Sequence, residues 1–294
     1  MMDEIRLIEN DRMQLEISDV GAEPQTIWDK ERKRSALWRG DPRYWKRRAP
    51  ILFPNVGTNY HNEYRFDGHV YPTSQHGFAR DRIFTCVEQS GDRLVHQLVD
   101  DDATMESYPF PFMLTVTHRL EGDRIVVEWQ VKNTGTGPMY FTIGGHPAFA
   151  LLKNALDKKN YYLEFPDKTQ LTYTLIDPGE GNPLPDNTFV MELDDHRLAL
   201  SDELFAKDAL IFDGGQIETV ALYKNDGEPL VRMDAPGFPN FGIWSVEGAP
   251  FVCLEPWIGR TDDAGFTGDL SKKPGITQVE AGDEFSASYS ITLL

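Results

Sequence analysis

Basic residues are in deficit in this sequence, which has 29 lysines and arginines against 47 aspartates and glutamates and a formal net charge of −18. Nucleic acids and anionic membranes are bound through basic surfaces, so neither is expected as a partner. A field of this sign also works against highly anionic substrates. The charge therefore favours a neutral small molecule as the ligand.

Cysteines and long apolar runs are also scarce. The two cysteines, Cys86 and Cys253, do not form a close pair of the kind that zinc sites use, and they predict free thiols in a reducing compartment. No run approaches the roughly 20 apolar residues of a membrane helix. Residues 1–12 are charged and lack the apolar segment of a secretory signal. We therefore expect a cytoplasmic protein.

Helical periodicity is nearly missing, and alternation of apolar and polar residues takes its place. The alternation runs through residues 13–17, 125–131 and 285–293, as in strands that have one face on a core. Turn sequences at Glu121-Gly122-Asp123 and Asn225-Asp226-Gly227 separate strand-like segments. They predict two hairpins.

These patterns predict an antiparallel all-β fold, a large β-sandwich formed by residues 1–294 as a single domain. The 19 prolines and 24 glycines are spread along the chain, as many short strands with frequent turns require. Residues 202–206 are a candidate for a short helical turn, with Ser201 as its cap. Residues 177–187 are rich in proline, glycine and polar side chains, and we interpret them as a long loop.

Three short motifs combine glycine or proline with a titratable residue and aromatic neighbours. Residues 75–81 read QHGFARD, residues 144–149 read GGHPAF, and residues 253–257 read CLEPW. Each has a purely structural alternative. A histidine beside glycine is often a turn residue, a glycine pair can form a bulge, and a glutamate in a strand can be an edge charge. No motif identifies a site when it is taken alone.

The ordered set of three motifs resembles the aldose 1-epimerase (galactose mutarotase) family, in particular its bacterial LacX-like branch. The resemblance covers most of the chain. It begins with Gly21-Ala22-Glu23 and continues through residues 48–54 (RAPILFP) into the motifs. It implies a large antiparallel supersandwich that holds a sugar in a cleft on one concave face, without a metal or another cofactor.

The resemblance also implies three catalytic roles. Glu255 matches the general base that takes the proton of the anomeric C1 hydroxyl, and His146 matches the general acid that protonates the ring oxygen. His76 matches a second histidine, which hydrogen-bonds near that oxygen. The open aldehyde then rotates about C1–C2 and recloses. One group accepts a proton and the other donates one, on opposite sides of a C–O bond. Each such proton transfer increases the reaction rate by about 10²–10⁴-fold.

Residues near the motifs are candidates for binding the sugar. Asp208 matches a sugar-contacting aspartate of the family, with Asp213 as its rival. Trp257 is either a stacking wall for the sugar or a core residue. Thr58 stands where better-known galactose mutarotases carry an arginine, which leaves the identity of the sugar open.

Two arginines are candidates for a contact with the sugar or with an anionic group on it. Arg80 either makes that contact or pairs with Asp81, because arginine favours carboxylates. Arg48, next to Arg47, either makes a second contact or belongs to a solvated turn. The two arginines keep open a mutarotase for hexose 6-phosphates as the alternative to one for free aldohexoses.

Two further questions stay open at this stage. A non-catalytic sugar-binding protein on the same scaffold is the second alternative function. The chain is expected to be a monomer or a homodimer, because the edge strands of an all-β protein allow either state.

His61, His69 and His76 include no helical i, i+4 pair, so no metal site is expected there.

Overall fold

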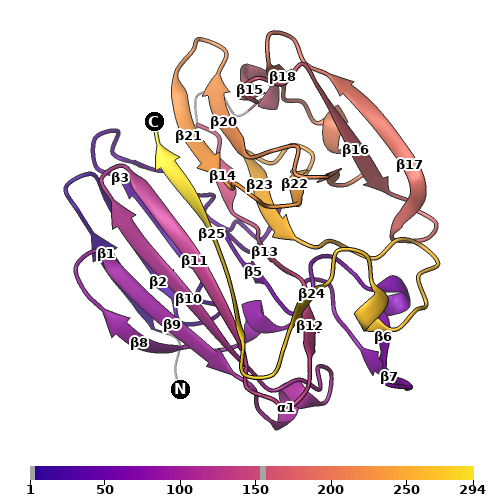
Figure 1. The fold of residues 1–294 in the computed structure, drawn as a ribbon. Coiled ribbons are helices and arrows are strands. Elements are labelled where there is room, and N and C mark those ends of the chain that lie inside the picture. The colour runs from indigo at the N-terminus through magenta and orange to yellow at the C-terminus, as the bar shows by residue number, and fades with distance from the viewer. Residues whose placement is uncertain (1–3, 153–156) are drawn as a thin grey trace.

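Two large antiparallel sheets dominate the fold (Figure 1). The computed structural model describes residues 4–152 and 157–294. The nine-stranded sheet has the order β18 (Arg197–Ala199), β15 (Tyr161–Glu164), β20 (Thr219–Lys224), β21 (Pro229–Asp234), β25 (Glu284–Leu293), β11 (Arg124–Asn133), β10 (Phe112–Glu121), β9 (Arg93–Val99) and β8 (Thr85–Gln89). The eight-stranded sheet has the order β17 (Pro183–Glu192), β16 (Gln170–Ile176), β19 (Leu210–Asp213), β22 (Asn240–Trp244), β23 (Phe251–Ile258), β13 (Ile143–Gly145) and β5 (Ile51–Leu52), and β14 (Ala148–Ala150) also pairs with β23.

Smaller elements complete the fold. A four-stranded sheet contains β1 (Ile5–Glu9), β2 (Met13–Ser18), β3 (Pro24–Asp29) and β4 (Arg34–Ser35), and two-stranded sheets pair β6 (Glu63–Phe66) with β7 (His69–Pro72) and β12 (Met139–Phe141) with β24 (Thr277–Val279). The helical elements are α1 (Asp102–Met105) and the 3-10 turns η1 (Tyr60–Asn62), η2 (Ala79–Asp81), η4 (Lys158–Asn160), η5 (Glu203–Phe205) and η6 (Leu270–Lys272). Within residues 4–152 and 157–294, none of the helices has the length and apolar character needed to cross a membrane.

The predicted antiparallel all-β fold is confirmed, and alternation is the reason it was predictable. In β11 the side chains of Ile125, Val127, Trp129 and Val131 are buried, and the residues between them are more exposed. The hairpin between β10 and β11 closes on the pair Glu121↔Arg124. The second predicted hairpin joins β20 to β21.

Two local predictions need correction. Residues 177–187 are not one loop, because β17 begins at Pro183 and pairs with β16. This strand lies at the edge of its sheet and most of its side chains face solvent, so it tolerates proline and shows no clear alternation. The helical turn near residues 202–206 is η5, and its N-cap residue is Asp202 rather than Ser201.

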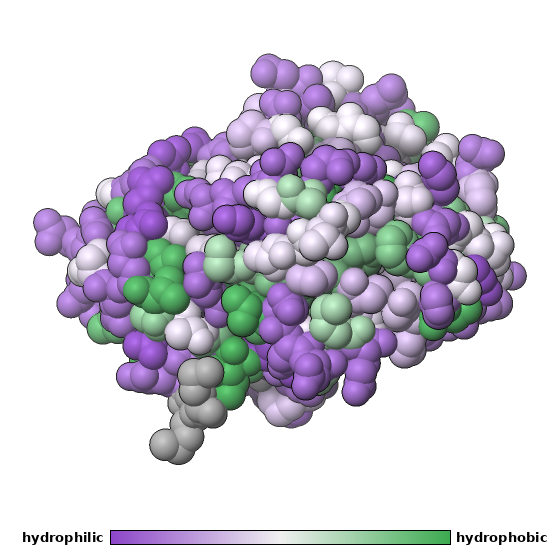
Figure 2. Space-filling view, turned by 60° about the horizontal axis from the view of Figure 1, so that its bottom comes forward, coloured by the Kyte–Doolittle hydropathy of each residue, from purple (hydrophilic) through white to green (hydrophobic). Residues whose placement is uncertain are grey.

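The core lies between the large sheets and draws side chains from both. A single cluster of buried apolar residues includes Trp129 and Tyr289 of the nine-stranded sheet and Phe241 of the eight-stranded sheet. The sheets approach closely at Gly145, where a Cβ would lie 2.9 Å from the Tyr289 hydroxyl oxygen. The outer face shown in Figure 2 is mostly hydrophilic, with apolar side chains in small groups.

Two histidines are buried on neighbouring strands of the nine-stranded sheet. His96 of β9 is hydrogen-bonded through Nε2 to Asp19 Oδ1 at 3.0 Å, and Arg6 also binds this carboxylate. His118 of β10 is 1% exposed, and its Nδ1 has no hydrogen-bond partner among the described residues. Burial lowers the pKa of His118 to about 3, with a smaller contribution from His96. Burial also lowers the pKa of His96, against the opposing effect of Asp19.

These histidines should make the fold sensitive to acid. Below pH of about 6.5 the unfolded chain binds protons that the folded chain excludes, so stability present near neutral pH is lost as pH falls. Each buried histidine should contribute up to about 1.4 kcal/mol per pH unit in this range. His118→Leu should reduce the slope of unfolding free energy against pH, measured by urea denaturation between pH 4 and 7. His69→Gln, at an exposed histidine, should leave the slope unchanged; equal slopes in all three proteins would contradict this assignment.

Candidate functional site

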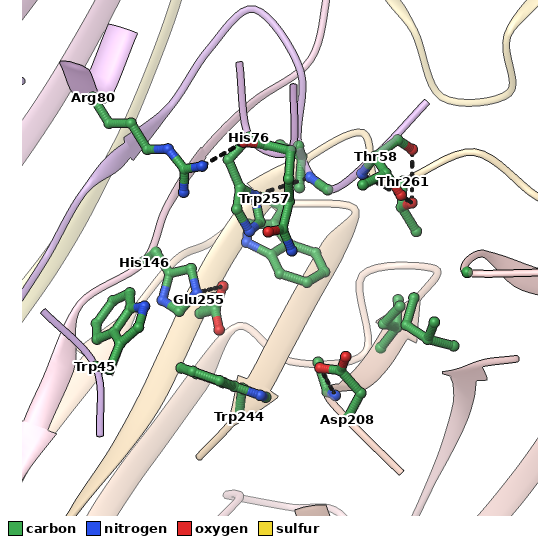
Figure 3. A pocket seen from close by; sticks show the side chains of 17 residues that line it. Trp45, Thr58, His76, Arg80, His146, Asp208, Trp244, Glu255, Trp257 and Thr261 are labelled. Atoms are coloured by element: carbon green, nitrogen blue, oxygen red, sulfur yellow. Dashed lines mark hydrogen bonds and ion pairs between the residues drawn. The ribbon is translucent and has the colours of Figure 1, made fainter. Parts of the chain in front are cut away.

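A cavity of about 440 Å³ lies over the eight-stranded sheet and brings the three sequence motifs together (Figure 3). The candidate catalytic and sugar-binding residues that line it are His76, Arg80, His146, Asp208, Glu255 and Trp257, and Thr58 lines it as well. Strand β23 carries Glu255 and Trp257, the segment between β13 and β14 carries His146, and the turn that precedes η2 carries His76. His76 and Glu255, nearly 180 positions apart in the chain, therefore line the same cavity.

Glu255 and His146 are in direct contact at the floor of the cavity. His146 Nε2 lies 3.3 Å from Glu255 Oε2, and the two residues are 6% and 1% exposed. Strand pairing produces this contact, because Ala148 of β14 is paired with Cys253 of β23 and so fixes His146 next to the strand that carries Glu255. The carboxyl group and the imidazole, which were expected to act on opposite sides of a C–O bond, are thus neighbours on one side of the cavity.

Burial drives both groups of this pair toward their uncharged forms. It raises the pKa of Glu255 well above its usual value, and the negative charge of Asp208 adds to the effect while Trp257 opposes it. Burial lowers the pKa of His146 to about 3, and the positive charges of Arg80 and Arg47 act in the same direction. A neutral carboxyl group beside a neutral imidazole offers one group that can give a proton and one that can accept it, which is a suitable arrangement for proton exchange.

His76 is held by an unusual backbone conformation. Its φ is +66°, in the left-handed region that non-glycine residues rarely adopt, and Gly77 follows with the same φ. A Cβ on Gly77 would lie 2.3 Å from the Phe53 carbonyl oxygen, so the turn requires glycine there. Strain of this kind is typical of functional positions.

The hydrogen bonds of His76 define its tautomer. Its Nδ1 accepts from the Gly57 backbone N–H at 3.0 Å, and its own backbone N–H donates to the Gly57 carbonyl oxygen. Burial lowers the pKa of His76 well below its usual value, so the imidazole is neutral. The proton of a neutral ring whose Nδ1 accepts a hydrogen bond resides on Nε2. His76 can therefore donate one hydrogen bond to a ligand.

The Trp257 side chain accounts for the presence of glycine at two positions of the flanking strands. A Cβ on Gly144 of β13 would lie 2.5 Å from Trp257 Cδ1, and a Cβ on Gly242 of β22 would lie 2.3 Å from Trp257 Cζ2. The indole thus lies across the backbone of β13 and β22, and no residue larger than glycine fits beneath it at these two positions. Trp257 is 5% exposed and lines the cavity, so it combines the wall and packing roles.

Arg80 brings a poorly compensated positive charge to the cavity. Its Nη2 donates to the Gln75 carbonyl oxygen at 2.5 Å, but its buried Nε has no hydrogen-bond partner among the described residues. Asp81 lies 3.8 Å away and is bound more closely by Arg47, at 2.8 Å. Burial lowers the pKa of Arg80 to about 10, and Arg47 adds to this effect.

Two other candidate residues lie outside the cavity lining. Arg48 donates from Nε to the Arg39 carbonyl oxygen and from Nη1 to Gln25, so the structure does not bring it to the site. Asp213 accepts from Arg260 and Asn240, which leaves Asp208 as the aspartate in the cavity. Sequence reasoning could not separate these cases, because the distinction depends on contacts between distant segments.

Two tryptophans were missed by sequence reasoning. Trp45 stacks on the His146 imidazole with ring centroids 4.7 Å apart, and Trp244 meets the same ring edge-on at 5.6 Å. Trp45 belongs to an irregular segment without periodicity, and its carbonyl oxygen accepts a hydrogen bond from Trp38 Nε1. Its neighbours Lys46-Arg47-Arg48 suggested only a surface turn. The aromatic rings cover His146 and limit its contact with water.

At another part of the lining, Thr58 and Thr261 present hydroxyl groups to the cavity. Their Oγ1 atoms lie 3.3 Å apart, and Asn182 Nδ2 donates to both. The position that corresponds to the arginine of better-known galactose mutarotases is therefore occupied by the neutral Thr58, which is held by hydrogen bonds. This part of the cavity suits a hydroxyl-rich ligand better than an anion.

Comparisons with known proteins identify the family of the chain. The family model described as aldose 1-epimerase matches residues 3–266. The chain belongs to the aldose 1-epimerase family. The chromosomal LacX protein of Lactococcus lactis subsp. lactis is 31% identical over 98% of both chains.

Solved structures of proteins described as galactose mutarotase related or galactose mutarotase-like share the fold. A galactose mutarotase related enzyme from Lactobacillus acidophilus is 31% identical, with a TM-score of 0.93 over 99% of this chain and 97% of that one. A galactose mutarotase-like protein from Lactobacillus casei ATCC 334 is 30% identical, with a TM-score of 0.91 over 99% of this chain and 100% of that one. The predicted galactose mutarotase-like supersandwich is thereby confirmed.

The close contact between Gly242 and Trp257 can be tested in this epimerase-family chain. Gly242→Ala should displace the indole and destabilise the fold by about 1–3 kcal/mol, because extra volume in a packed core forces side chains from their preferred positions. Urea unfolding should reveal the loss. Gly91→Ala is the matched control, since a Cβ there meets nothing within 4 Å. A Gly242 variant as stable as this control would show that the indole is not confined.

Proposed function

We propose that this chain is an aldose 1-epimerase that interconverts the α and β anomers of a free aldohexose. The observation that carries the proposal is the contact of 3.3 Å between the Glu255 carboxyl and the His146 imidazole in the cavity. Membership of the aldose 1-epimerase family supports the reaction type. The reaction is proposed to need no metal and no other cofactor, and to take place in the cytoplasm.

The paired groups suit ring opening because the two reacting oxygens are also neighbours. O1 and the ring oxygen O5 are both bonded to C1, so an acid and a base side by side can reach both. In the reactive state, Glu255 is the carboxylate and His146 is the imidazolium. Glu255 takes the O1 proton, O1 forms the carbonyl, and the C1–O5 bond breaks. His146 gives its proton to O5.

Reclosure reverses these steps after rotation about C1–C2. O5 adds to the other face of the aldehyde carbon and returns its proton to His146, while Glu255 returns its proton to O1. No proton is gained or lost in the cycle. During ring opening the pair changes from an ion pair to two neutral groups, which burial favours. The free energy needed to form the ion pair from the neutral pair in this buried environment is therefore recovered during ring opening.

The other cavity residues are proposed to hold the sugar. Nε2–H of His76 donates a hydrogen bond near O5, in keeping with its tautomer. Asp208 accepts from sugar hydroxyls, and Trp257 stacks against an apolar face of the ring. Trp45 and Trp244 exclude water from the His146 side, which strengthens the electrostatic interactions between the reacting groups.

Polarimetry tests the activity directly. The approach of pure α-glucose and α-galactose to anomeric equilibrium should accelerate with the protein. Glu255→Gln should lower kcat/KM by about 10²–10⁴-fold, because an amide cannot accept the O1 proton. Glu247→Gln, at an exposed glutamate, is the control and should keep the full rate. A sugar that binds without any acceleration would instead support the non-catalytic sugar-binding alternative.

A mutarotase for hexose 6-phosphates is the second candidate, and one observation favours it. The Arg80 guanidinium is largely buried at the cavity, with one donor unpaired and its nearest carboxylate bound by Arg47. A phosphate would satisfy the free donor and compensate the charge. The net charge of −18 and the neutral Thr58 and Thr261 hydroxyls favour the free sugar.

Arg80→Gln distinguishes the two substrates. If the phosphate is bound here, KM for glucose 6-phosphate should rise by about 10–100-fold, the loss of one charge-assisted hydrogen bond, with little change for glucose. If the substrate is the free hexose, wild-type protein should prefer glucose and the variant should affect both sugars alike. Arg39→Gln, at an exposed arginine paired with Asp41, provides the control for a general loss of positive charge.

A further inference from the structure

Cys253 lies directly beside the proposed proton-transfer pair, although the proposed reaction does not use it. Ligand atoms of His146, Cys253 and Glu255 all lie within 4.8 Å of one another. Cys253 is fully buried, and it shares its side of β23 with Glu255 because alternate residues of a strand point the same way. The three residues thus offer an imidazole nitrogen, a thiol sulfur and a carboxylate oxygen around one point.

The spacing of the cluster suits a tetrahedral metal. Zinc binds nitrogen and oxygen at roughly 2.0–2.2 Å and sulfur at roughly 2.3 Å, so neighbouring ligand atoms of a tetrahedron are about 3.3–3.7 Å apart. The Nε2–Oε2 distance of 3.3 Å already has this length. The sulfur lies close enough that small side-chain rotations complete the third corner.

A second observation points to a missing ligand. Glu255 Oε2, the oxygen that faces His146, is buried and accepts no hydrogen bond within the part of the chain that the structure describes. Buried carboxylate oxygens normally have a partner, because leaving one unsatisfied is unfavourable. A metal ion between the carboxylate, the imidazole and the thiolate would provide it.

Charge also favours a divalent ion over a monovalent one. A thiolate and a carboxylate together contribute two negative charges, so with a neutral imidazole they form an uncharged complex with one divalent cation. An uncharged complex avoids the large penalty for burying net charge. The thiolate selects zinc or cadmium over magnesium or calcium, which prefer oxygen ligands.

We propose that His146, Cys253 and Glu255 form a site for a thiophilic divalent cation, Zn²⁺ in particular, and that its binding inhibits the enzyme. Three protein ligands leave a fourth position open toward the cavity for water or a sugar hydroxyl. Inhibition rests on the proposed function, because the metal occupies both groups that transfer protons. The binding site itself does not depend on that function.

Binding is tested without any activity measurement. Protein freed of metal with a chelator is titrated with Cd²⁺, and the ultraviolet absorption of the cadmium–thiolate bond is recorded, with calorimetry for Zn²⁺. Wild-type protein should bind one equivalent. Cys253→Ala should remove the absorption band and weaken Zn²⁺ binding by more than about 100-fold, beyond the loss typical of outer-shell partners. Cys86→Ala, at the other free cysteine, should bind as wild type.

Inhibition is then measured by polarimetry with Zn²⁺ and after addition of a chelator. Wild-type and Cys86→Ala proteins should lose activity with Zn²⁺ and regain it with chelator, while Zn²⁺ should not change whatever rate Cys253→Ala shows. Cys253→Ser serves if the alanine variant does not fold. An absent cadmium band, or a band that survives in the Cys253 variants, would overturn the proposal. A band without any wild-type mutarotase activity would refute the proposed function and leave the metal site standing.

Discussion

The contact between the Glu255 carboxyl and the His146 imidazole is the constraint on which the rest of the site depends. Two titratable groups are buried side by side, and among the described residues no other charged side chain forms an ion pair with either of them. Trp45 and Trp244 cover the imidazole, and Trp257 lies beside the carboxyl. The low-dielectric surroundings make the protonation states of the two groups sensitive to a ligand, as the proposed ring opening requires.

The two histidines of the site are positioned by different means. His146 is fixed by strand pairing, so its position follows from the register between β14 and β23. His76 is fixed by a strained turn, whose backbone exchanges hydrogen bonds with Gly57. The regular element supports the group that is proposed to transfer a proton, and the irregular turn orients the single hydrogen-bond donor of His76. Both devices give the side chains little freedom before a ligand binds.

Alternation made the fold predictable from sequence, and the ordered motifs identified His76, His146 and Glu255 among the residues around the cavity. Edge strand β17 was missed because its exposed, proline-containing sequence reads as a loop. Trp45 was missed because its approach to His146 depends on a segment about 100 residues away, and no local pattern reports that contact. Arg48 was included for its charge, but its contacts with Arg39 and Gln25 are equally non-local.

The close approach of Gly145 to Tyr289 links the site to the order in which the chain is made. Gly145 directly precedes His146 and packs against Tyr289 of β25. Tyr289 is synthesised more than 140 residues after Gly145. His76 and His146 leave the ribosome well before that support exists. The cavity therefore lacks this support during most of translation, until β25 enters the nine-stranded sheet.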